Sequence, residues 1–451
     1  MKSQPIKRPL QKAHRINTKL VNFITTGDIY GIARCYYAAC ASLKVAALIV
    51  ASIFLLATQS SAAQPAKPTL DPQLWANYKQ LYISAEGRVI DTGNQNISHS
   101  EGQGTGMLLA NAYHDQATFQ KLWDWTQKNL QIRNDKLFAW RWQPASTPAV
   151  ADLNNASDGD ILIAWALYRA AQQWHNTAYR HAAQQISRDI RTRLIRRTAY
   201  GWIILPGRVG FEKNNGIVVN LSYWIFPAFA DFAKFDPAPE WGQLTRSGLK
   251  LIKTARFGQW HLPPDWLLLE RKTPNEKTEK LSLPEQFEAQ FGYNAIRIPL
   301  YLAWAKHREK DLMMPFINFW TSDVHGSTRV GRFQPPASGD TSAPGRMPKC
   351  GERRDAQEPP SMHGAGERSE GFRMPGAAFT HGTRGIAATT NLLNNSLDSN
   401  EASPGLKAII QLIYTSHGLT PPVTVAEYSP QDYYSASLLL LARLAKTETN
   451  F

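Results

Sequence analysis

The stretch that decides the fold is Ser98-His-Ser-Glu-Gly-Gln-Gly-Thr-Gly-Met-Leu-Leu109. It places the carboxylate of Glu101 among Ser, His, Gln and three glycines, directly before an apolar helical pattern. Glycines let a backbone approach a ligand closely. No Lys or Arg is nearby in this loop, so we expect a carboxylic acid at the start of a helix whose pKa is set by the fold. The same residues also fit a plain helix N-terminus capped by Ser100 or Glu101.

Apolar side chains recur at helical spacing along most of the chain, beginning with Trp75, Tyr78, Leu81 and Tyr82. The loops between these stretches are long and rich in Gly, Pro, Asp and Trp, and no convincing run of alternating strands occurs. The pattern predicts a mostly helical array whose functional loops gather at one end. The predicted helices cover residues 105–113, 116–130, 159–174, 178–197, 223–234, 241–256, 293–306, 311–320 and 431–446.

The positive charge of the chain is concentrated in two segments. The 451 residues carry a formal charge of +14. Residues 1–63 hold eight Lys and Arg against one Asp, and residues 326–385 hold nine against six acids. The rest of the chain shows no basic stripe with interleaved aromatic residues. This distribution argues against nucleic acid as a partner.

An apolar run of 13 residues, Val45–Ala57, follows Lys44 and precedes a cluster of small residues. This pattern predicts a signal peptide cleaved near Ala63 and export to the periplasm or the medium. A downstream start site or an uncleaved anchor would also explain the long basic leader. Two of the three cysteines precede the cleavage site and the third is Cys350, so we expect no disulfide framework in the exported chain.

Residues 326–385 differ from the rest of the chain in composition. They hold 11 Gly and 7 Pro and contain no Leu or Ile. Such a segment buries too little apolar surface to offset its ordering entropy. We therefore expect a disordered insert or an out-of-frame stretch within one helical domain. The predicted divisions are a leader and signal peptide at 1–63, the first part of the domain at 64–325, the insert at 326–385, and C-terminal helices at 386–451.

A second polar stretch, Asn154-Asn-Ala-Ser-Asp-Gly-Asp160, also precedes an apolar helical pattern. Asp158 and Asp160 suit a helix N-terminus, as caps or as charges at the positive end of the dipole. With Asn155 they resemble part of a calcium loop, but the bidentate Glu of such a loop is missing. We expect neither a metal nor a cofactor.

Two further stretches place polar groups beside aromatic residues, as sugar sites require. They are Pro263-Pro-Asp-Trp266 and Phe291-Gly-Tyr-Asn-Ala-Ile-Arg297. No GxSxG, P-loop or HExxH motif is present.

Taken together, the chain resembles glycoside hydrolase family 8, in particular the secreted endo-β-1,4-glucanases associated with bacterial cellulose synthesis. The matching pieces follow family order and are Gly87–Asp91, Ser100–Met107, Asn154–Asp160 with Ala164–Trp165, Leu205–Gly207, Ser222–Tyr223, Pro264–Trp266, Tyr293–Arg297 and Asp432–Ser435.

The resemblance implies an (α/α)6 barrel with a sugar-binding cleft at one end, which hydrolyses β-1,4-glucan with inversion. Inversion needs a protonated acid and a base roughly 6.5–9.5 Å away that holds a water. On the family's pattern, Glu101 is the general acid and Asp158 is the carboxylate at the centre of the cleft. The residues expected to bind substrate are Trp140, Tyr223, Asp265, Trp266, Tyr293, Asn294 and Arg297. Further candidate platforms for sugar stacking are Trp142 and Trp224, although core packing would explain any one of these aromatic residues.

Asn294 departs from the family's pattern, because the best-known members carry an Asp there as the catalytic base. An amide cannot accept the proton, so Asn294 would at most orient water or sugar. The base must then come from another residue, and Asp158 is the first choice. The other candidates are Asp160, Asp265, Glu285 and Glu288.

Two alternatives remain open, one to a cellulose-like substrate and one to catalysis. The same fold could act on chitosan, xylan or mixed-linkage β-glucan. Cationic chitosan would need extra acidic residues in the cleft, and the chain outside its two basic segments is not strongly acidic, which argues against chitosan. The protein could also be a non-catalytic accessory protein that binds glucan. The expected partner is the polysaccharide, with a functional link to a cellulose synthase complex, and we expect a monomer.

Overall fold

The computed structural model describes residues 70–271, 278–326, 390–393, 402–424 and 432–450. The predictions for the leader at 1–63 and for residues 327–385 of the insert lie outside these ranges. Residues 67–451 cluster as one unit. Within it, α12 (Pro404–Ser416) and α13 (Tyr433–Thr449) pack against α10 (Arg297–Trp304), so the segments before and after the predicted insert meet in one fold.

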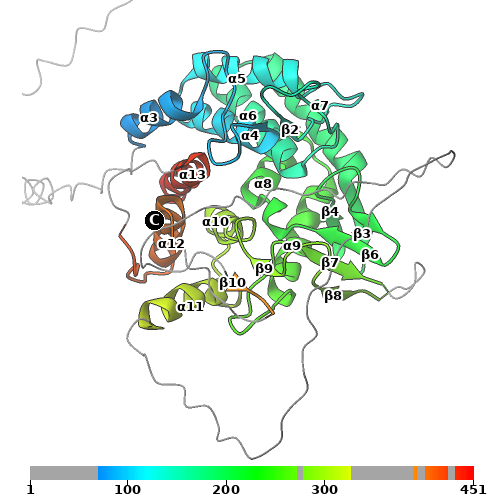
Figure 1. The fold of residues 1–451 in the computed structure, drawn as a ribbon, viewed down its shortest axis with the longest axis vertical. Coiled ribbons are helices and arrows are strands. Elements are labelled where there is room, and N and C mark those ends of the chain that lie inside the picture. Colours follow the sequence, from blue (N-terminus) through cyan, green and yellow to red (C-terminus); the bar gives the residue numbers. More distant parts are fainter. Residues whose placement is uncertain (1–69, 272–277, 327–389, 394–401, 425–431, 451) are drawn as a thin grey trace, which may run out of the picture. The chain divides into compact units, whose positions relative to one another are not determined.

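Eleven α-helices dominate the described residues (Figure 1). Each predicted helical range overlaps one of them, and none is long and apolar enough to cross a membrane. The remaining helices are α3 (Pro72–Tyr82), α4 (Ser100–Ala112), α5 (Gln116–Asn129), α6 (Ser157–Trp174), α7 (Thr177–Leu194), α8 (Phe226–Phe235), α9 (Pro239–Thr254) and α11 (Lys310–Gly326).

Short antiparallel strands lie between the helices, although the sequence shows no convincing run of alternating strands. The largest sheet has the order β5-β6-β7-β8, and β3 pairs with β4. The strand β6 is buried throughout, which gives a short apolar run without the alternation that marks a half-exposed strand. The strands are β1 (Ser98–His99), β2 (Arg141–Trp142), β3 (Ile195–Thr198), β4 (Gly201–Ile204), β5 (Glu212–Lys213), β6 (Gly216–Val219), β7 (Leu267–Glu270), β8 (Lys280–Ser282), β9 (Gln290–Phe291) and β10 (Thr390–Asn391).

Two glycines allow α4 and α6 to approach closely. A Cβ added to Gly104 would lie 2.6 Å from the Cβ of Leu162, and one added to Gly159 would collide with the side chain of Ser100. Real Cβ atoms do not approach neighbours so closely. The glycines of the two polar motifs therefore bring the first turns of the two helices together.

The core is rich in aromatic residues, and Trp224 belongs to it. Its side chain is fully buried, its Nε1 donates to the backbone oxygen of Leu244 at 3.0 Å, and its ring lies against Gly248. The interpretation of Trp224 as a sugar-stacking platform is therefore wrong. A sequence does not show which of two adjacent aromatic residues faces a cleft.

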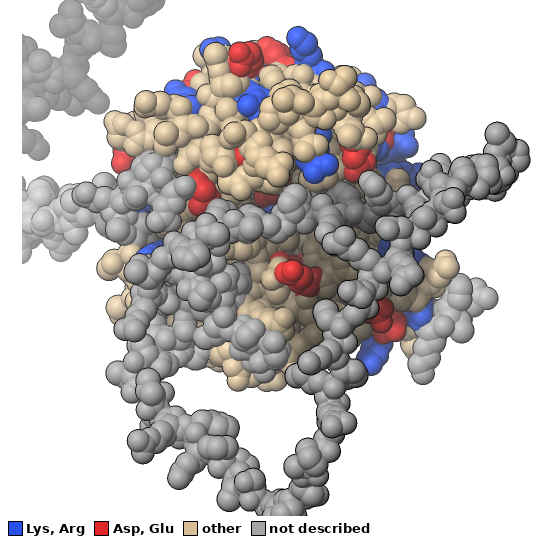
Figure 2. All heavy atoms as spheres, in the orientation of Figure 1, with Lys and Arg blue, Asp and Glu red and all other residues tan. Residues whose placement is uncertain are grey.

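Figure 2 shows Lys and Arg interspersed with Asp and Glu on the face it draws. On that face the described residues form no continuous basic patch. Half-buried Arg196 pairs with Glu212 at 2.9 Å, and exposed Lys234 pairs with Asp231 at 2.7 Å.

Candidate active site

Arg297 brings Glu101 and Asp158 together. Its Nη1 lies 2.5 Å from Oε1 of Glu101 and 3.2 Å from Oδ2 of Asp158. Arg297 and Asp158 are almost fully buried, while 23% of the Glu101 side chain is exposed. Glu101 is therefore the member of this cluster that solvent or a ligand can reach.

Each of these three residues lies in the first turn of a helix. Glu101 follows the first residue of α4, Asp158 follows the first residue of α6, and Arg297 begins α10. No Lys or Arg lies near Glu101 in the sequence of this loop. In the structure, however, Arg297 from a distant segment lies beside it, so the expectation of no nearby cation is wrong. The guanidinium of Arg297 contacts the two carboxylates, and its expected role in substrate binding stays a prediction.

Asp158 is held by its own helix and by Arg297. The Gly159 N–H donates to Oδ1 at 2.8 Å, which leaves Oδ2 for Arg297. Burial and the nearby charge of Glu101 raise the pKa of Asp158 to about 6, against the opposing effect of Arg297. The cluster therefore takes up a proton in the mildly acidic range.

Glu101 and Asp158 lie close together. Because both contact the same nitrogen of Arg297, their contacting oxygens cannot be farther apart than the sum of 2.5 and 3.2 Å. The carboxylates of an inverting pair are separated by about 6.5–9.5 Å, which leaves room for a water. This geometry argues against Asp158 as the base and favours a role in binding the sugar.

Asn294 lies beside the same cluster. Its Oδ1 accepts from Nη2 of Arg297 and from Nδ2 of Asn220, both at 3.0 Å. Oδ1 of Asn220 in turn accepts from the N–H and hydroxyl of Ser222, at 3.0 and 2.7 Å. Both of these contacts fall on its oxygen, and its side chain also forms a hydrogen bond with the carboxyl group of Asp265, so its amide nitrogen is turned toward Asp265.

Asp265 organises the loop that carries Tyr293 and Asn294. Its Oδ1 accepts from the N–H groups of Gly292 and Ala295 at 2.9 and 2.8 Å. The residue is 2% exposed, and burial raises the pKa of its carboxyl group. The structure thus places Asp265 beneath the loop, and direct contact with substrate stays a prediction.

Asp160 points away from Asp158, toward the loop before α6. Its Oδ1 accepts from the Phe138 N–H at 2.9 Å and its Oδ2 from Nδ2 of Asn155 at 2.7 Å. It is fully buried, and burial raises its pKa to about 8. These contacts pair both oxygens with protein donors and indicate a structural role for Asp160.

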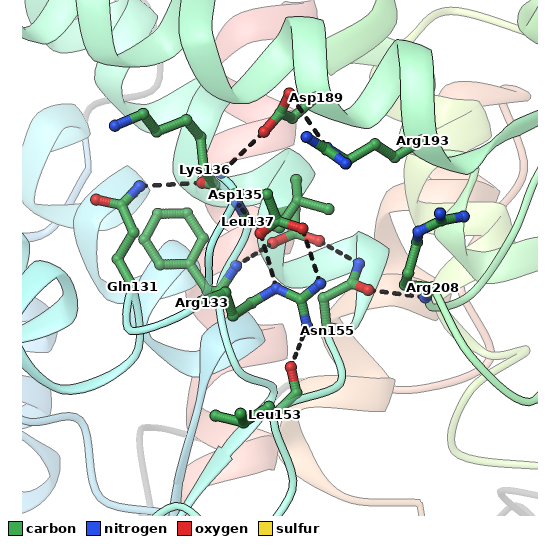
Figure 3. A network of polar contacts seen from close by, with 12 residues as sticks. Gln131, Arg133, Asp135, Lys136, Leu137, Leu153, Asn155, Asp189, Arg193 and Arg208 are labelled. Carbon is green, nitrogen blue, oxygen red and sulfur yellow. Dashed lines mark hydrogen bonds and ion pairs between the residues drawn. The ribbon is translucent and has the colours of Figure 1, made fainter.

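Figure 3 shows the polar network around Asn155. The Arg208 N–H donates to Oδ1 of Asn155 at 2.8 Å, and Arg133 forms a two-point ion pair with Asp135 at 2.8 and 2.9 Å. Arg133 also donates to the backbone oxygen of Leu153. The network joins the loops before α6 and after β4, and thereby fixes the start of α6.

Glu285 and Glu288 are exposed, in the loop between β8 and β9. A role for either as base stays a prediction. The calcium interpretation fails on orientation, because Asn155 binds Asp160 while Asp158 binds Arg297. Among the described residues no group of three His, Cys, Asp or Glu side chains could hold a metal ion.

Tyr223 lies beside Arg297, and its ring meets that of Trp266 edge-on, with ring centres 6.3 Å apart. The Arg297 guanidinium lies 5.8 Å from the centre of the Tyr223 ring. Burial and the charge of Asp158 hold the pKa of Tyr223 well above its usual value. Trp266 stacks on Phe287 and Phe211, with ring centres 4.3 and 5.8 Å apart. Both candidates are nearly buried, so sugar stacking on them stays a prediction.

An arginine guanidinium lies over the ring of Trp140 and another over the ring of Trp142. Arg141 lies 4.6 Å from the centre of the Trp140 ring, and Arg88 lies 5.0 Å from that of Trp142. Nε1 of Trp140 donates to Asp152 at 2.8 Å. Trp142 is partly exposed, whereas Trp140 is 5% exposed. Sugar binding by Trp140 stays a prediction.

Several residues of the site were not singled out from the sequence. Tyr434 packs edge-on against the partly exposed Tyr293, with ring centres 6.0 Å apart, and its hydroxyl donates to the Tyr293 oxygen. His99 and Asp91 lie next to the first turn of α4. The sequence did contain a signal for Asp91 and Tyr434, because Gly87–Asp91 and Asp432–Ser435 belong to the motifs that carry the resemblance.

Comparison with known proteins gives a consistent result. The sequence model described as "Glycosyl hydrolases family 8" matches residues 42–334. The chain is 40% identical over 268 residues to a "Probable endoglucanase" of Novacetimonas hansenii, covering 59% of this chain and 77% of that protein. It is 39% identical over 231 residues to an "Endoglucanase" of Cellulomonas uda, covering 51% of this chain and 62% of that one.

Solved structures agree with the sequence match. The endo-β-1,4-glucanase CMCax from Acetobacter xylinum superimposes with a TM-score of 0.65 at 31% identity, covering 84% of this chain and 98% of that one. Endoglucanase Cel10 from Klebsiella pneumoniae, a family 8 glycosyl hydrolase, gives 0.65 at 31% identity, with 83% and 99% covered. The likeness confirms the predicted (α/α)6 barrel. The chain belongs to family 8 of the glycosyl hydrolases.

Proposed function

We propose that the protein is an endo-acting glycoside hydrolase that cleaves β-1,4-glucosidic bonds in cellulose or a related β-glucan with inversion. The observation that carries the proposal is the position of Glu101, partly exposed in the first turn of α4 and joined to buried Asp158 by Arg297. Family membership and the endoglucanase relatives support the same reaction.

In this proposal Glu101 protonates the glycosidic oxygen as the bond breaks. Asp158 and Arg297 form a charged floor below it, where hydrogen bonds to a distorted sugar would strengthen in the transition state. Asn294 lies beside them, in contact with Arg297 and Asp265, and orients the sugar or the attacking water. Both oxygens of the Asp160 and Asp265 carboxylates accept N–H donors, which argues against either residue as the one that takes the proton from this water.

The test is hydrolysis of a panel of soluble polysaccharides by the full chain. We expect new reducing ends from carboxymethyl cellulose, with a rapid fall in viscosity that marks internal cleavage. Proton NMR of cello-oligosaccharide products should show the α-anomer first, as inversion requires. Hydrolysis of chitosan or xylan in preference to glucan would support the alternative substrates instead.

A non-catalytic glucan-binding role is the second candidate, and Asn294 favours it. An amide in the place of a base would leave a cleft that binds but does not turn over. Calorimetry with cello-oligosaccharides separates the two candidates. Binding without release of reducing ends would establish the accessory role.

We also propose that the protein is exported and acts as a monomer in connection with a cellulose synthase complex. The apolar run at 45–57 supports export, and the resemblance to endoglucanases of cellulose synthesis supports the connection. Fractionation of an expressing bacterium and N-terminal sequencing near Ala63 test export. Light scattering tests the monomer, and addition of the protein to cellulose-synthesising membranes tests the connection.

A further inference from the structure

The imidazole of His99 caps the helix that carries Glu101. Its Nδ1 accepts a hydrogen bond from the backbone N–H of Gly102 at 3.0 Å, at the start of α4. Ser, Thr, Asp and Asn usually supply such caps. An imidazole in this place makes the cap depend on a group that titrates near neutral pH.

Asp91 faces the other nitrogen of the ring. Nε2 of His99 lies 3.4 Å from Oδ2 of Asp91. Asp91 is itself held by the turn that follows it, because its N–H donates to the oxygen of Ile97 at 2.9 Å. Since Nδ1 must accept from Gly102, the proton of the neutral ring lies on Nε2 and points to Asp91. The two contacts select one tautomer.

The peptide after Glu101 is tightly enclosed. A Cβ on Gly102 would lie 2.7 Å from the hydroxyl of Tyr433 and 3.4 Å from Nδ1 of His99. The rings of His99 and Tyr433 meet edge to face, with centres 5.7 Å apart. The backbone from which Glu101 extends is therefore set by His99 on one side and Tyr433 on the other.

We propose that Asp91 and His99 are a positioning pair, which fixes the first turn of α4 and so holds the carboxyl group of Glu101 in place for proton donation. The pair acts through Gly102 and not on the sugar. The inference rests on the proposed function, because it concerns the same reaction.

Protonation of His99 would remove the cap, because Nδ1 would then carry a hydrogen that faces the Gly102 N–H. Burial lowers the pKa of His99, but the hydrogen bond with Asp91 and the nearby negative charges outweigh it and raise the pKa overall. The cap is therefore lost as the pH falls through this raised value. The titratable and charged groups that face the ring or lie opposite it in the strand register are Asp91, Glu101, Asp158, Tyr433 and Arg141.

The test compares His99→Asn, which keeps a capping oxygen but does not titrate, with His99→Ala, which removes the cap. On soluble β-1,4-glucan we expect His99→Ala to lower kcat on the order of 10²-fold with little change in KM. His99→Asn should restore most of kcat at neutral pH and extend activity to lower pH. Asp91→Asn should also move the acid limb to lower pH, since it removes a charge that raises the pKa of His99. His307→Asn, beyond the far end of α10, is the matched control and should leave kcat, KM and the pH profile unchanged.

Unchanged kcat in His99→Ala, or a pH profile of His99→Asn that superimposes on the wild type, would overturn the proposal. If His99→Ala does not fold, the profiles of His99→Asn and Asp91→Asn decide. Nitrogen-15 NMR of the His99 ring gives a readout independent of turnover. We expect the Nε2–H tautomer, and the Nδ1–H tautomer would refute the pair even if the proposed hydrolase activity itself were absent.

Discussion

Nη1 of Arg297 lies 2.5 Å from Oε1 of Glu101, although 196 positions separate the two residues in the chain. Glu101 can act as an acid only when its carboxyl group is protonated. In that form Asp158 is, among the described residues, the carboxylate left to pair with this nitrogen of Arg297. The contact therefore couples protonation of Glu101 to the strength of the Arg297–Asp158 ion pair.

Glu101→Gln should abolish turnover and largely preserve ligand binding. The amide keeps the shape of the side chain and its contact with Arg297 through the remaining oxygen, but it has no proton to donate. We expect kcat on soluble glucan to fall by roughly 10²- to 10⁴-fold, with cello-oligosaccharide affinity measured by calorimetry nearly unchanged. Near-wild-type kcat would exclude Glu101 as the acid.

Asp265→Asn should retain most of the activity, whereas Asp265→Ala should not. Asparagine keeps an oxygen for the N–H groups of Gly292 and Ala295, which alanine leaves unpaired at a cost of about 1–3 kcal/mol per buried group. Steady-state kinetics and thermal unfolding of both variants check this. If the two variants are equally inactive while both are folded, Asp265 is a base and not a loop anchor.

Asn294→Asp should raise kcat. The present oxygen accepts from Arg297 and Asn220, so the new carboxylate oxygen takes the place of the amide nitrogen, next to Asp265. A positioned base contributes on the order of 10²- to 10⁴-fold. Initial rates on carboxymethyl cellulose measure the gain, and an unchanged or lower rate would show that the wild-type base lies elsewhere.

Asp160→Asn should destabilise the protein. Both oxygens of this fully buried carboxylate accept from N–H donors, of Phe138 and Asn155, so an amide nitrogen must face one of them. We expect a loss of about 1–3 kcal/mol in the free energy of unfolding, measured by urea denaturation. Asp124→Asn, on the exposed face of α5, is the control and should change the free energy little.

The contribution of Asp115 to stability should disappear in acid. Burial raises the pKa of Asp115, but hydrogen bonds from Lys79, Thr118 and Trp75 outweigh it and lower the pKa to about 2. This contribution is fully present above the unfolded pKa of about 4 and is lost as the pH falls toward 2. The stability gap between wild type and Asp115→Asn should therefore narrow between pH 4 and pH 2. Unfolding measured across this range checks the sign, and a widening gap would contradict it.

The sequence predicted the helices well because their apolar spacing is local information. It also identified Glu101 and Asp158, since each stands in a glycine-bearing motif at a helix start. It could not show that Arg297 lies between them, because that contact depends on how three helices pack. The sequence also could not decide whether Asp265 has a catalytic or a structural role. The N–H groups from which it accepts lie 27 and 30 positions away in the chain.

The site is built from the N-terminal first turns of three helices, and one of the residues there, Arg297, is a cation. The N-terminal end of a helix carries partial positive charge, which favours anions such as Glu101 and Asp158 and disfavours a guanidinium. Arg297 is thus buried at the unfavourable end of α10 and depends on the two carboxylates contributed by other helices. Removal of one carboxylate leaves it a counterion, whereas removal of both leaves an isolated buried cation. The three residues must therefore be redesigned together, because the effect of changing one depends on the charge of the other two.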